Sequence, residues 1–374
     1  MARVLYVVTR AQRRGAEVDA TLLAAHMVPD YEPMVATLYA GADPAILGGR
    51  VPVLASGVAP GPVRKLLGIS PASIRFVRSA IRDYGPDLIV AYGGEPLLHA
   101  IPAARKAKVP VLYVKISMSV EKLKRGRRRA AFRRALSRAA AVAAVAPHLA
   151  SELLEDLEEE RSVHITPTFR TASDVAPARH RDAVREEFGF GPDDVVAVFA
   201  GNLSSEKGPD VALEAVAGAP SNVRLVVAGD GPLAAALAER AARPDLDGRV
   251  TLLGARTDVP RLLAGADLVL STSRQEGRPG VILEAALAGL PVVATQVGSI
   301  GDLLRDGTDG LLVAPGDVAG LTAALATLAG DAGARSRLGL AARARSSEYL
   351  PDVVLPAWRA AFEDALSTFR ARSE

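Results

Sequence analysis

ADLVLSTSRQEGRPGVILEAALAGLPVVAT, residues 266–295, predicts one complete strand–helix–strand unit. Its runs at 268–271 and 291–294 are almost continuously apolar, as in parallel strands that are buried on both faces. A glycine-rich loop joins the first run to a helical pattern that begins at 281. A strand, a crossover helix and a second parallel strand form the repeating unit of doubly wound α/β proteins, so the stretch predicts that fold class.

The same alternation of short apolar runs and longer helical patterns continues along the whole chain. The strand candidates are 3–9, 34–39, 87–91, 109–114, 141–145 and 163–165 in the first half, and 195–200, 223–228, 250–253, 268–271, 291–294 and 310–313 in the second. The stretch 166–183 is rich in Pro, Ser, Thr and charged residues, which indicates a linker. We therefore expect two Rossmann-like, doubly wound parallel-sheet domains, at 1–168 and 169–350, that face each other across a cleft. Ligands of such sheets bind at the carboxyl ends of the strands, so the cleft is the expected site.

Length and composition limit the class of protein. A chain of 374 residues is too long for one ordinary core, and 49% hydrophobic content with balanced charge is typical of folded globular proteins. The sequence has no cysteine, which excludes disulfides, thiolate metal sites and a cysteine nucleophile. The apolar N-terminal run is too short for a signal-peptide core, and the run at 139–146 is far short of a membrane span. We therefore expect a cytoplasmic protein.

The two halves of the chain differ in charge. Residues 1–170 contain 25 Lys and Arg against 15 Asp and Glu, and residues 171–374 contain 20 against 27, so the halves carry +10 and −7. Nine of the basic residues lie between Lys122 and Arg138. Such a segment indicates peripheral contact with an anionic membrane at its inner surface, or with an anionic acceptor, and a solvated helix face is the alternative. Nucleic acid is disfavoured, because aromatic residues are sparse there and no nucleic-acid motif accompanies them.

The stretch 266–295 contains two glutamates, which are its main candidates for a chemical role. Glu276 lies in the loop beside Gly277, and Glu284 lies about one turn into the helix from Gly280. The amides and positive dipole end of a helix N-terminus suit a phosphate, and the glycines let a ligand approach the backbone. Carboxylates on both sides suggest a ligand with hydroxyl groups on both sides of a diphosphate, such as a nucleotide sugar. Solvated glutamates are the alternative, which the otherwise apolar VILEAALA disfavours for Glu284.

Other predicted loops of the second half end at the same edge of the sheet. The loop after 195–200 carries Asn202 and Lys207, and a lysine there is well placed to neutralise a diphosphate, although most lysines are simply solvated. Gly229 ends the next strand in a tight turn, and Arg256 follows the strand after that. In the first half, Gly15 opens a helix after the first strand, but its loop is not G-x-G-x-x-G, so a nicotinamide cofactor is disfavoured.

A metal site is not implied by the sequence. The five histidines lack the spacing of a metal site, and the D-x-D at 245–247 lies in PDLDG, which indicates a turn.

The second domain closely resembles the nucleotide-sugar-binding domain of the family 4 (group 1) retaining glycosyltransferases, which have the GT-B fold. The resemblance covers about residues 195–318 and is carried by GNLSSEKG, VVAGDGP, VTLLGARTDV, the stretch quoted above and VGSIGDLLRDGTDGLLVAPGD. Glu276 and Glu284 match the family's E-x7-E motif, and RGAE at 14–17 looks like its first-domain glycine loop.

The resemblance implies roles for these residues. Glu276 is the implied catalytic residue, which holds hydroxyls of the donor sugar near the reacting carbon, and Glu284 is implied to hold the ribose. The other donor-binding residues by this resemblance are Lys207 and the amides of Gly280 and Val281 at the diphosphate, Gly15 closing over it, Arg256 near the base, and Asn202, Gly229 and Gly277. The resemblance also implies that a C-terminal helix, at 351–374, packs back toward the first domain.

Two departures from the family's pattern concern the same site. The chain has Asn202 where the family usually has arginine, so one positive charge for the diphosphate is missing. The segment PVLYVKIS, at 110–117, lacks a histidine that the family often has. On the acceptor side, Glu95 and Lys115 are the candidates for contact with the sugar or the acceptor.

We therefore expect a glycosyltransferase that moves a sugar from a UDP- or GDP-sugar to an acceptor hydroxyl, with the family's retention of configuration and without a metal or other cofactor. A catalytically degenerate nucleotide-sugar-binding protein is one alternative, which the two departures favour. A nucleotide-sugar epimerase of the same fold is the other, and the E-x7-E pattern argues against it. Lipid, polysaccharide, antibiotic aglycone and small metabolite all stay open as acceptors.

Overall fold

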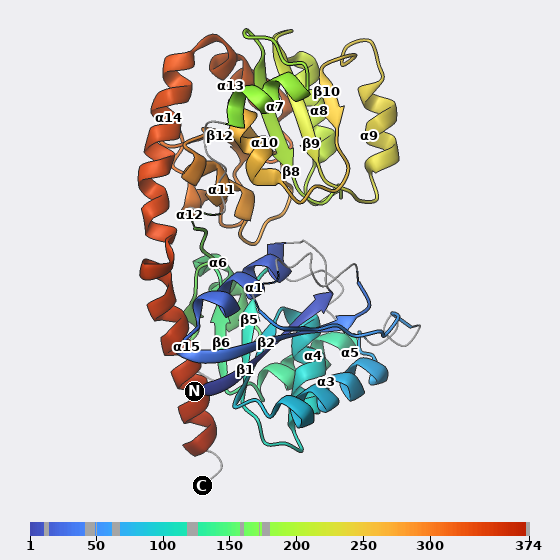
Figure 1. The fold of residues 1–374 in the computed structure, drawn as a ribbon, viewed down its shortest axis with the longest axis vertical. Coiled ribbons are helices and arrows are strands. Elements are labelled where there is room, and N and C mark those ends of the chain that lie inside the picture. The colour runs from blue at the N-terminus through green and yellow to red at the C-terminus, as the bar shows by residue number, and fades with distance from the viewer. Residues whose placement is uncertain are drawn as a thin grey trace. The chain divides into compact units, whose positions relative to one another are not determined.

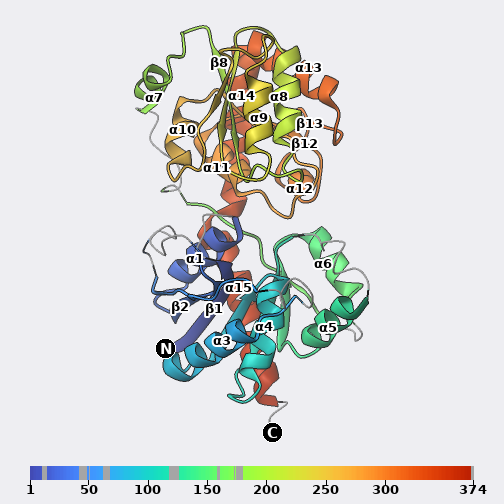
Figure 2. The same ribbon diagram turned by 90° about the vertical axis from the view of Figure 1, so that its right-hand side faces the viewer.

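The computed structural model describes residues 1–10, 15–41, 49, 51–61, 68–117, 126–157, 161–171, 173 and 180–371. The chain forms two compact units. Unit 1 consists of Met1–Thr168 and Val354–Glu374, and unit 2 of Phe169–Val353. Each unit is a parallel sheet with helices on both faces (Figures 1 and 2).

Unit 1 contains a seven-stranded sheet in the order β3-β2-β1-β4-β5-β6-β7, and every pairing is parallel. Its strands are β1 Ala2–Arg10, β2 Tyr31–Tyr39, β3 Val53–Leu54, β4 Leu88–Tyr92, β5 Val111–Lys115, β6 Ala141–Ala144 and β7 His164–Ile165. Its helices are α1 Gly15–His26, α3 Pro71–Tyr84, α4 Gly94–Ala104, α5 Gly126–Leu136, α6 Pro147–Leu154 and the larger part of α15 Pro351–Ala371.

Alternate residues of the strands in unit 1 pack against different helices. Leu5 of β1 belongs to the core formed with α3, α4 and α5. The neighbouring Tyr6 instead faces α15, where its ring lies 6.3 Å from that of Phe362. Trp358 of the same helix stacks on Tyr92 at 6.2 Å. The sheet is therefore covered on both faces, and α15 belongs to the layer opposite α3, α4 and α5 (Figure 1).

Unit 2 contains a six-stranded parallel sheet in the order β10-β9-β8-β11-β12-β13. Its strands are β8 Val195–Ala200, β9 Val223–Ala228, β10 Val250–Leu252, β11 Leu268–Ser271, β12 Val292–Thr295 and β13 Leu311–Val313. Its helices are α7 Arg181–Glu187, α8 Pro209–Gly218, α9 Ala234–Ala241, α10 Val259–Gly265, α11 Gly280–Ala288, α12 Ile300–Leu303, α13 Val318–Gly330 and α14 Ala332–Arg345, followed by the 3-10 turn Ser346–Tyr349.

The sheet of unit 2 separates two apolar cores. Val195 and Ala197 of β8 pack with α8, α9 and α13, whereas Val196 and Val198 pack with α10, α11 and α12. This alternation follows from the period of two along a strand. Both faces are apolar, which explains why the strands appear in the sequence as continuous apolar runs.

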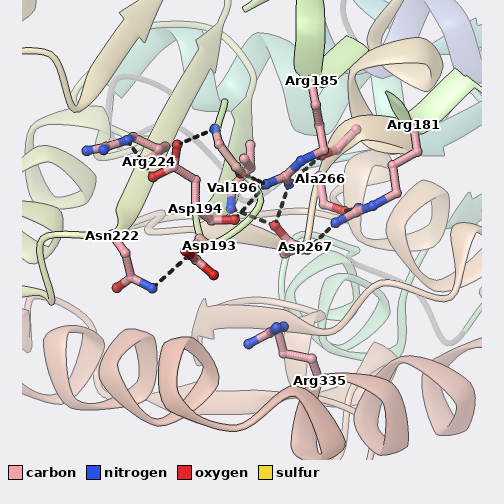
Figure 3. A network of polar contacts seen from close by, with 12 residues as sticks. Arg181, Arg185, Asp193, Asp194, Val196, Asn222, Arg224, Ala266, Asp267 and Arg335 are labelled. Atoms are coloured by element: carbon pink, nitrogen blue, oxygen red, sulfur yellow. Dashed lines mark hydrogen bonds and ion pairs between the residues drawn. The ribbon is translucent and has the colours of Figure 1, made fainter. Parts of the chain in front are cut away.

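A partly buried polar network joins α7 to the amino ends of the strands in unit 2 (Figure 3). Asp267, directly before β11, accepts hydrogen bonds from Arg181 Nη2 at 2.6 Å, Arg185 Nη1 at 3.0 Å and the backbone amide of Val196 at 2.8 Å. Arg185 also donates to the carbonyl of Asp194 at 2.8 Å. These bonds fix the first helix of the unit on the edge of the sheet opposite the loops described below.

The predicted fold class and the twelve predicted strands are confirmed, with three differences. β3 was not predicted, because Val53–Leu54 is too short to give an apolar run. β2 begins at Tyr31 rather than at 34, because Glu32 and Pro33 obscure its start. The predicted linker 166–183 overlaps α7, which begins at Arg181. Within the part of the chain that the structure describes, no helix is both long and apolar enough to span a bilayer.

Candidate functional site

The strand order of unit 2 reverses between β8 and β11. In doubly wound sheets, ligands bind outside the carboxyl ends of the strands at such a switch point. Two loops start there: residues 201–208 follow β8, and residues 272–279 follow β11. The first contains Lys207 and the second contains Glu276, so the topology brings these predicted site residues to one edge of one sheet.

Lys207 and Glu276 form a direct ion pair. The Lys207 Nζ donates to Glu276 Oε1 at 2.6 Å and to Oε2 at 2.7 Å. The Ser273 hydroxyl donates to the same Oε1 at 2.7 Å. The Glu276 side chain is 5% exposed, whereas that of Lys207 is 32% exposed. The carboxylate is therefore held in one orientation by two neighbouring groups, and the ammonium remains partly accessible to solvent.

The two loops are also joined through their backbones. The Thr272 hydroxyl donates to the carbonyl of Gly208 at 2.7 Å. Gly208 has φ 62, and a Cβ at this position would lie 2.2 Å from the Thr272 carbonyl oxygen. Only glycine satisfies both the positive φ and this close approach. Arg274 donates two hydrogen bonds to the Asp210 carboxylate, at 2.9 and 2.6 Å. These bonds hold the pKa of Asp210 below its usual value.

Glu284 has a cationic partner that the sequence did not suggest. Arg170 Nε donates to Glu284 Oε1 at 2.9 Å, and the two side chains are 4% and 18% exposed. The same guanidinium lies against Gly280, because a Cβ built there would be 1.9 Å from Arg170 Nη2. We expected Gly280 to leave room for a ligand, and in this structure the Arg170 guanidinium occupies that room. No local signal in the Pro- and Thr-rich linker distinguishes Arg170 from the other arginines there.

The remaining predicted residues of unit 2 lie in loops at the same edge or at the start of α11. Asn202 follows β8, and its carbonyl accepts from the Ser204 amide at 2.8 Å. Gly229 follows β9, and a Cβ there would lie 1.8 Å from the Gly201 carbonyl oxygen, so packing alone explains this glycine. Arg256 donates a two-bond fork to Asp258 at 2.8 and 2.7 Å. Gly277 is buried and accepts from the Ser299 amide at 3.3 Å, and Val281 is the second residue of α11.

Three predicted residues belong to unit 1. Gly15 is the exposed first residue of α1. Glu95 lies in the first turn of α4, and its Oε1 accepts from the Tyr39 hydroxyl at 2.8 Å. Lys115 ends β5, is 2% exposed, and its Nζ lies 3.2 Å from Glu152 Oε2. An acceptor that used Lys115 would therefore have to compete with a carboxylate that is already in place.

Among the residues that the structure describes, no group of three or more His, Asp or Glu side chains is arranged to hold a metal ion. Asp245 of the D-x-D sequence is bonded to Arg240, whose Nη2 lies 2.7 Å from its Oδ2. That ion pair explains Asp245 without a ligand.

Two family models match the chain, one in each half. Residues 3–170 match Glycosyltransferase Family 4, and residues 194–331 match Glycosyl transferases group 1. D-inositol 3-phosphate glycosyltransferase of Mycobacterium marinum is 36% identical over 198 residues, which are 49% of this chain and 42% of that protein. N-acetyl-alpha-D-glucosaminyl L-malate synthase of Bacillus anthracis is 29% identical over 173 residues, 46% of this chain and 45% of that protein. The matched part thus spans less than half the length of these curated relatives.

Solved structures share the fold over nearly the whole chain. Anabaena HepE in complex with UDP-glucose has a TM-score of 0.84 at 24% identity, covering 98% of this chain and 100% of that one. Sucrose-phosphate synthase of Thermosynechococcus elongatus has a TM-score of 0.81 at 17% identity, covering 98% and 100%. These likenesses show the fold, and the two family models, which match residues 3–170 and 194–331, show that this chain belongs to the family 4, group 1 glycosyltransferases.

Proposed function

We propose that this chain transfers a sugar from a nucleotide-diphosphate sugar to an acceptor hydroxyl, and that unit 2 binds the donor. The observation that carries the proposal is the arrangement around the first turns of α11. One carboxylate, Glu276, lies in the loop before this helix and is bonded to Lys207, and a second, Glu284, lies one turn into it. Carboxylates that accept hydrogen bonds from hydroxyl groups, on either side of a cation and a helix N-terminus, complement the order sugar–diphosphate–ribose in the donor.

The proposed donor contacts follow that order. Glu276 accepts from hydroxyls of the transferred sugar, and Glu284 accepts from the ribose. Lys207 and the amides of Gly280 and Val281 bind the diphosphate, with Gly277 shaping the loop beside it. The remaining proposed contacts are with Asn202 and Gly229 in the neighbouring loops, with Arg256 near the base, and with Gly15 of unit 1.

The proposed chemistry is a displacement at the anomeric carbon with retention of configuration. The acceptor oxygen bonds to the anomeric carbon on the face from which the diphosphate leaves, while the bond between that carbon and the diphosphate oxygen breaks, and the acceptor proton moves to the departing diphosphate. Negative charge grows on the diphosphate as this bond breaks, and a positioned ammonium and helix amides stabilise it. We propose that Lys207 and α11 supply this stabilisation without a metal ion.

We propose a UDP- or GDP-sugar as the donor. The UDP-glucose in the HepE structure supports uridine, although the likeness to that protein is one of fold. The contacts proposed for Glu276, Glu284 and Lys207 discriminate poorly between bases, because they involve phosphates and hydroxyls.

For the acceptor we propose a small hydroxylated anion. Two relatives act, by their names, on an inositol phosphate and on malate, which both carry negative charge. The excess of Lys and Arg in residues 1–170 suits such a partner. Glu95, fixed by Tyr39, and Lys115 are the proposed acceptor-side contacts.

A second proposed partner is an anionic membrane surface at residues 122–138. Part of this segment lies outside the described residues. In α5, Arg129 Nη2 lies 3.3 Å from Asp156 Oδ1, and Arg133 Nε donates to the Asp156 carbonyl at 3.2 Å. Arg129 and Arg133 are thus bonded to Asp156, which follows α6, so the proposed membrane contact depends on the other basic residues of the segment. Sedimentation with and without vesicles rich in phosphatidylserine tests this contact.

The alternative of a binding protein without turnover is favoured by one observation. Asn202 is uncharged, so Lys207 is the cation of the loop after β8 that can stabilise negative charge on the leaving diphosphate. Donor binding in the absence of product formation would support this alternative over the transferase.

The experiment that tests the transferase uses UDP-, GDP-, ADP- and dTDP-sugars labelled in the sugar. Each is incubated with the full chain, with and without inositol phosphate, malate and a lipid extract, in the presence and absence of chelator. We expect release of nucleoside diphosphate that depends on one acceptor, transfer of the label to it, and loss of both in Lys207→Ala. Conversion of the sugar without release of nucleoside diphosphate would instead support an epimerase. Binding without either product would support the degenerate protein.

A further inference from the structure

Arg170 is fixed within unit 2 by both its backbone and its side chain. Its amide donates to the Tyr349 carbonyl at 3.3 Å. Its Nη1 donates to the carbonyl of Phe169 at 2.8 Å, and its Nε donates to Glu284 Oε1 at 2.9 Å. The side chain is 4% exposed, so this is a buried guanidinium in a defined plane rather than a solvated linker arginine.

The position of this guanidinium relative to α11 is unusual for a cation. It lies against Gly280, the first residue of the helix, where a Cβ would be 1.9 Å from Arg170 Nη2. The N-terminus of a helix carries a partial positive charge, so a cation placed there is disfavoured unless a negative group accompanies it. Glu284 supplies such a group in this structure. A bound anion at the same place would stabilise both the helix end and the guanidinium.

Each of the two carboxylates of the E-x7-E pair thus forms an ion pair with a cationic side chain. Lys207 is bonded to Glu276, and Arg170 is bonded to Glu284. A nucleotide sugar carries hydroxyls for both carboxylates and phosphates for both cations. Its binding can therefore add ligand contacts to both ion pairs while leaving no charge without a partner. Arginine suits this arrangement, because its planar fork can bond a phosphate and a carboxylate at the same time.

We propose that Arg170 binds the donor's diphosphate, and that Glu284 orients it for this contact. The inference rests on the proposed function, since it adds a ligand to the same donor site. In this proposal, Arg170 in the linker is a second cation that contacts the diphosphate, besides Lys207. It also gives Gly280 a reason to be glycine, because any side chain there would displace the Arg170 guanidinium.

The test compares nucleosides with nucleoside diphosphates, because a phosphate contact acts only on the second. Dissociation constants are measured for uridine and UDP, and for guanosine and GDP, with wild type, Arg170→Gln, Arg170→Lys, Gly280→Ala and Lys207→Ala. Arg240→Gln is the matched control, since Arg240 is also paired with a glutamate of unit 2, Glu214, at 2.6 Å.

We expect Arg170→Gln to weaken binding of the diphosphate about tenfold or more and to change nucleoside binding by less than about threefold, as for loss of a charged hydrogen bond. Arg170→Lys should recover part of the loss, Gly280→Ala should resemble Arg170→Gln, and Arg240→Gln should resemble wild type. If Arg170 serves only to position Glu284 for the ribose, nucleoside and diphosphate will weaken by the same factor, which overturns the proposal.

The remaining outcomes separate this inference from the proposed function. If Lys207→Ala weakens the diphosphate and Arg170→Gln does not, the donor site stands and the role of Arg170 is wrong. If wild type binds none of the diphosphates, both are wrong. Circular dichroism and thermal unfolding accompany each variant. Should Arg170→Gln not fold, Arg170→Lys and Gly280→Ala carry the test, because both retain a positive charge at residue 170, and equal binding in all forms then contradicts the proposal.

Discussion

Lys207 and Glu276 are joined by two hydrogen bonds, from Nζ to Oε1 at 2.6 Å and to Oε2 at 2.7 Å. They are 69 residues apart in the sequence and come from the loops after two adjacent strands. The cation proposed for the diphosphate and the carboxylate proposed for the sugar are thus partners in one ion pair. Because the two side chains are bonded to each other, the effects of their substitutions on the free energy of unfolding should be coupled.

We expect that coupling to be measurable in a double-mutant cycle of Lys207→Ala and Glu276→Gln. Lys207→Ala alone leaves a carboxylate that is 5% exposed and keeps a hydrogen bond from the Ser273 hydroxyl but no cation, so the free energy of unfolding should fall by about 3 kcal/mol. Glu276→Gln should offset about 1–3 kcal/mol of that loss in the double variant. Urea unfolding of the four proteins measures the cycle, and strictly additive losses would contradict a coupled pair.

Gly208→Ala should distort the junction between the two loops. The new Cβ would lie 2.2 Å from the Thr272 carbonyl oxygen, and φ 62 disfavours alanine, so we expect a loss of about 2–3 kcal/mol in unfolding free energy and weaker donor binding. Gly330→Ala is the matched control, because that glycine lies within α13 with nothing within 4 Å of a Cβ. The control should be neutral or stabilising by up to about 1 kcal/mol. Equal thermal stability of the two variants would refute the steric explanation.

The pair Asp210–Arg274 should make stability depend on pH in the acid range. Hydrogen bonds from Arg274 lower the pKa of Asp210 below 3.8. A carboxyl group with a lowered pKa in the folded state stabilises the fold fully above pH 3.8, and this contribution disappears as the pH falls through the lowered value. The pair is partly exposed, so the contribution should be below about 1 kcal/mol.

Urea unfolding of wild type and Asp210→Asn at pH 7, 4, 3.5 and 3 checks this contribution. We expect the wild type to be the more stable protein at neutral pH and the difference to shrink below pH 3.8. A difference that stays constant, or grows as the pH falls, would be inconsistent with the ion pair.

Asp267→Ala should destabilise unit 2 through the network at the amino ends of its strands (Figure 3). The change removes the carboxylate that pairs with Arg185, whose side chain is 10% exposed, and the acceptor of the Val196 amide, so we expect the free energy of unfolding to fall by about 3–5 kcal/mol. The exposed Asp247 provides the control, and Asp247→Ala should stay within about 0.5 kcal/mol of wild type. Hydrogen exchange at the amides of β8 would report the effect locally.

The fold could be predicted because its determinants are local. Parallel strands that are buried on both faces leave continuous apolar runs, and the runs at 195–200 and 268–271 coincide with β8 and β11. β3 could not be predicted, because a two-residue strand is defined by its pairing with β2 rather than by a pattern of its own. The start of β2 at Tyr31 was missed for a related reason: its pairing with β1 tolerates Glu32 and Pro33, which local propensity disfavours.

The site could be predicted as a set of residue types but not as a set of contacts. Glu276 and Glu284 lie in one short stretch, so their spacing and the helix between them are visible in the sequence. The partner of Glu284 is 114 residues away in a segment without periodicity, and nothing local indicates where its side chain lies. The sequence predicts that a ligand approaches the backbone at Gly280, and only the packing shows that the Arg170 guanidinium lies there in this structure.

Calorimetric titration tests most directly whether Glu276 and Glu284, the E-x7-E pair, form the donor site. UDP-, GDP-, ADP- and dTDP-sugars are titrated into wild type, Glu276→Gln and Glu284→Gln, with and without chelator. We predict that one donor class binds wild type with a stoichiometry of one, that chelator does not change its affinity, and that each variant binds it at least about tenfold more weakly. Absence of binding to wild type, or variants that bind as tightly as wild type, would contradict the claim.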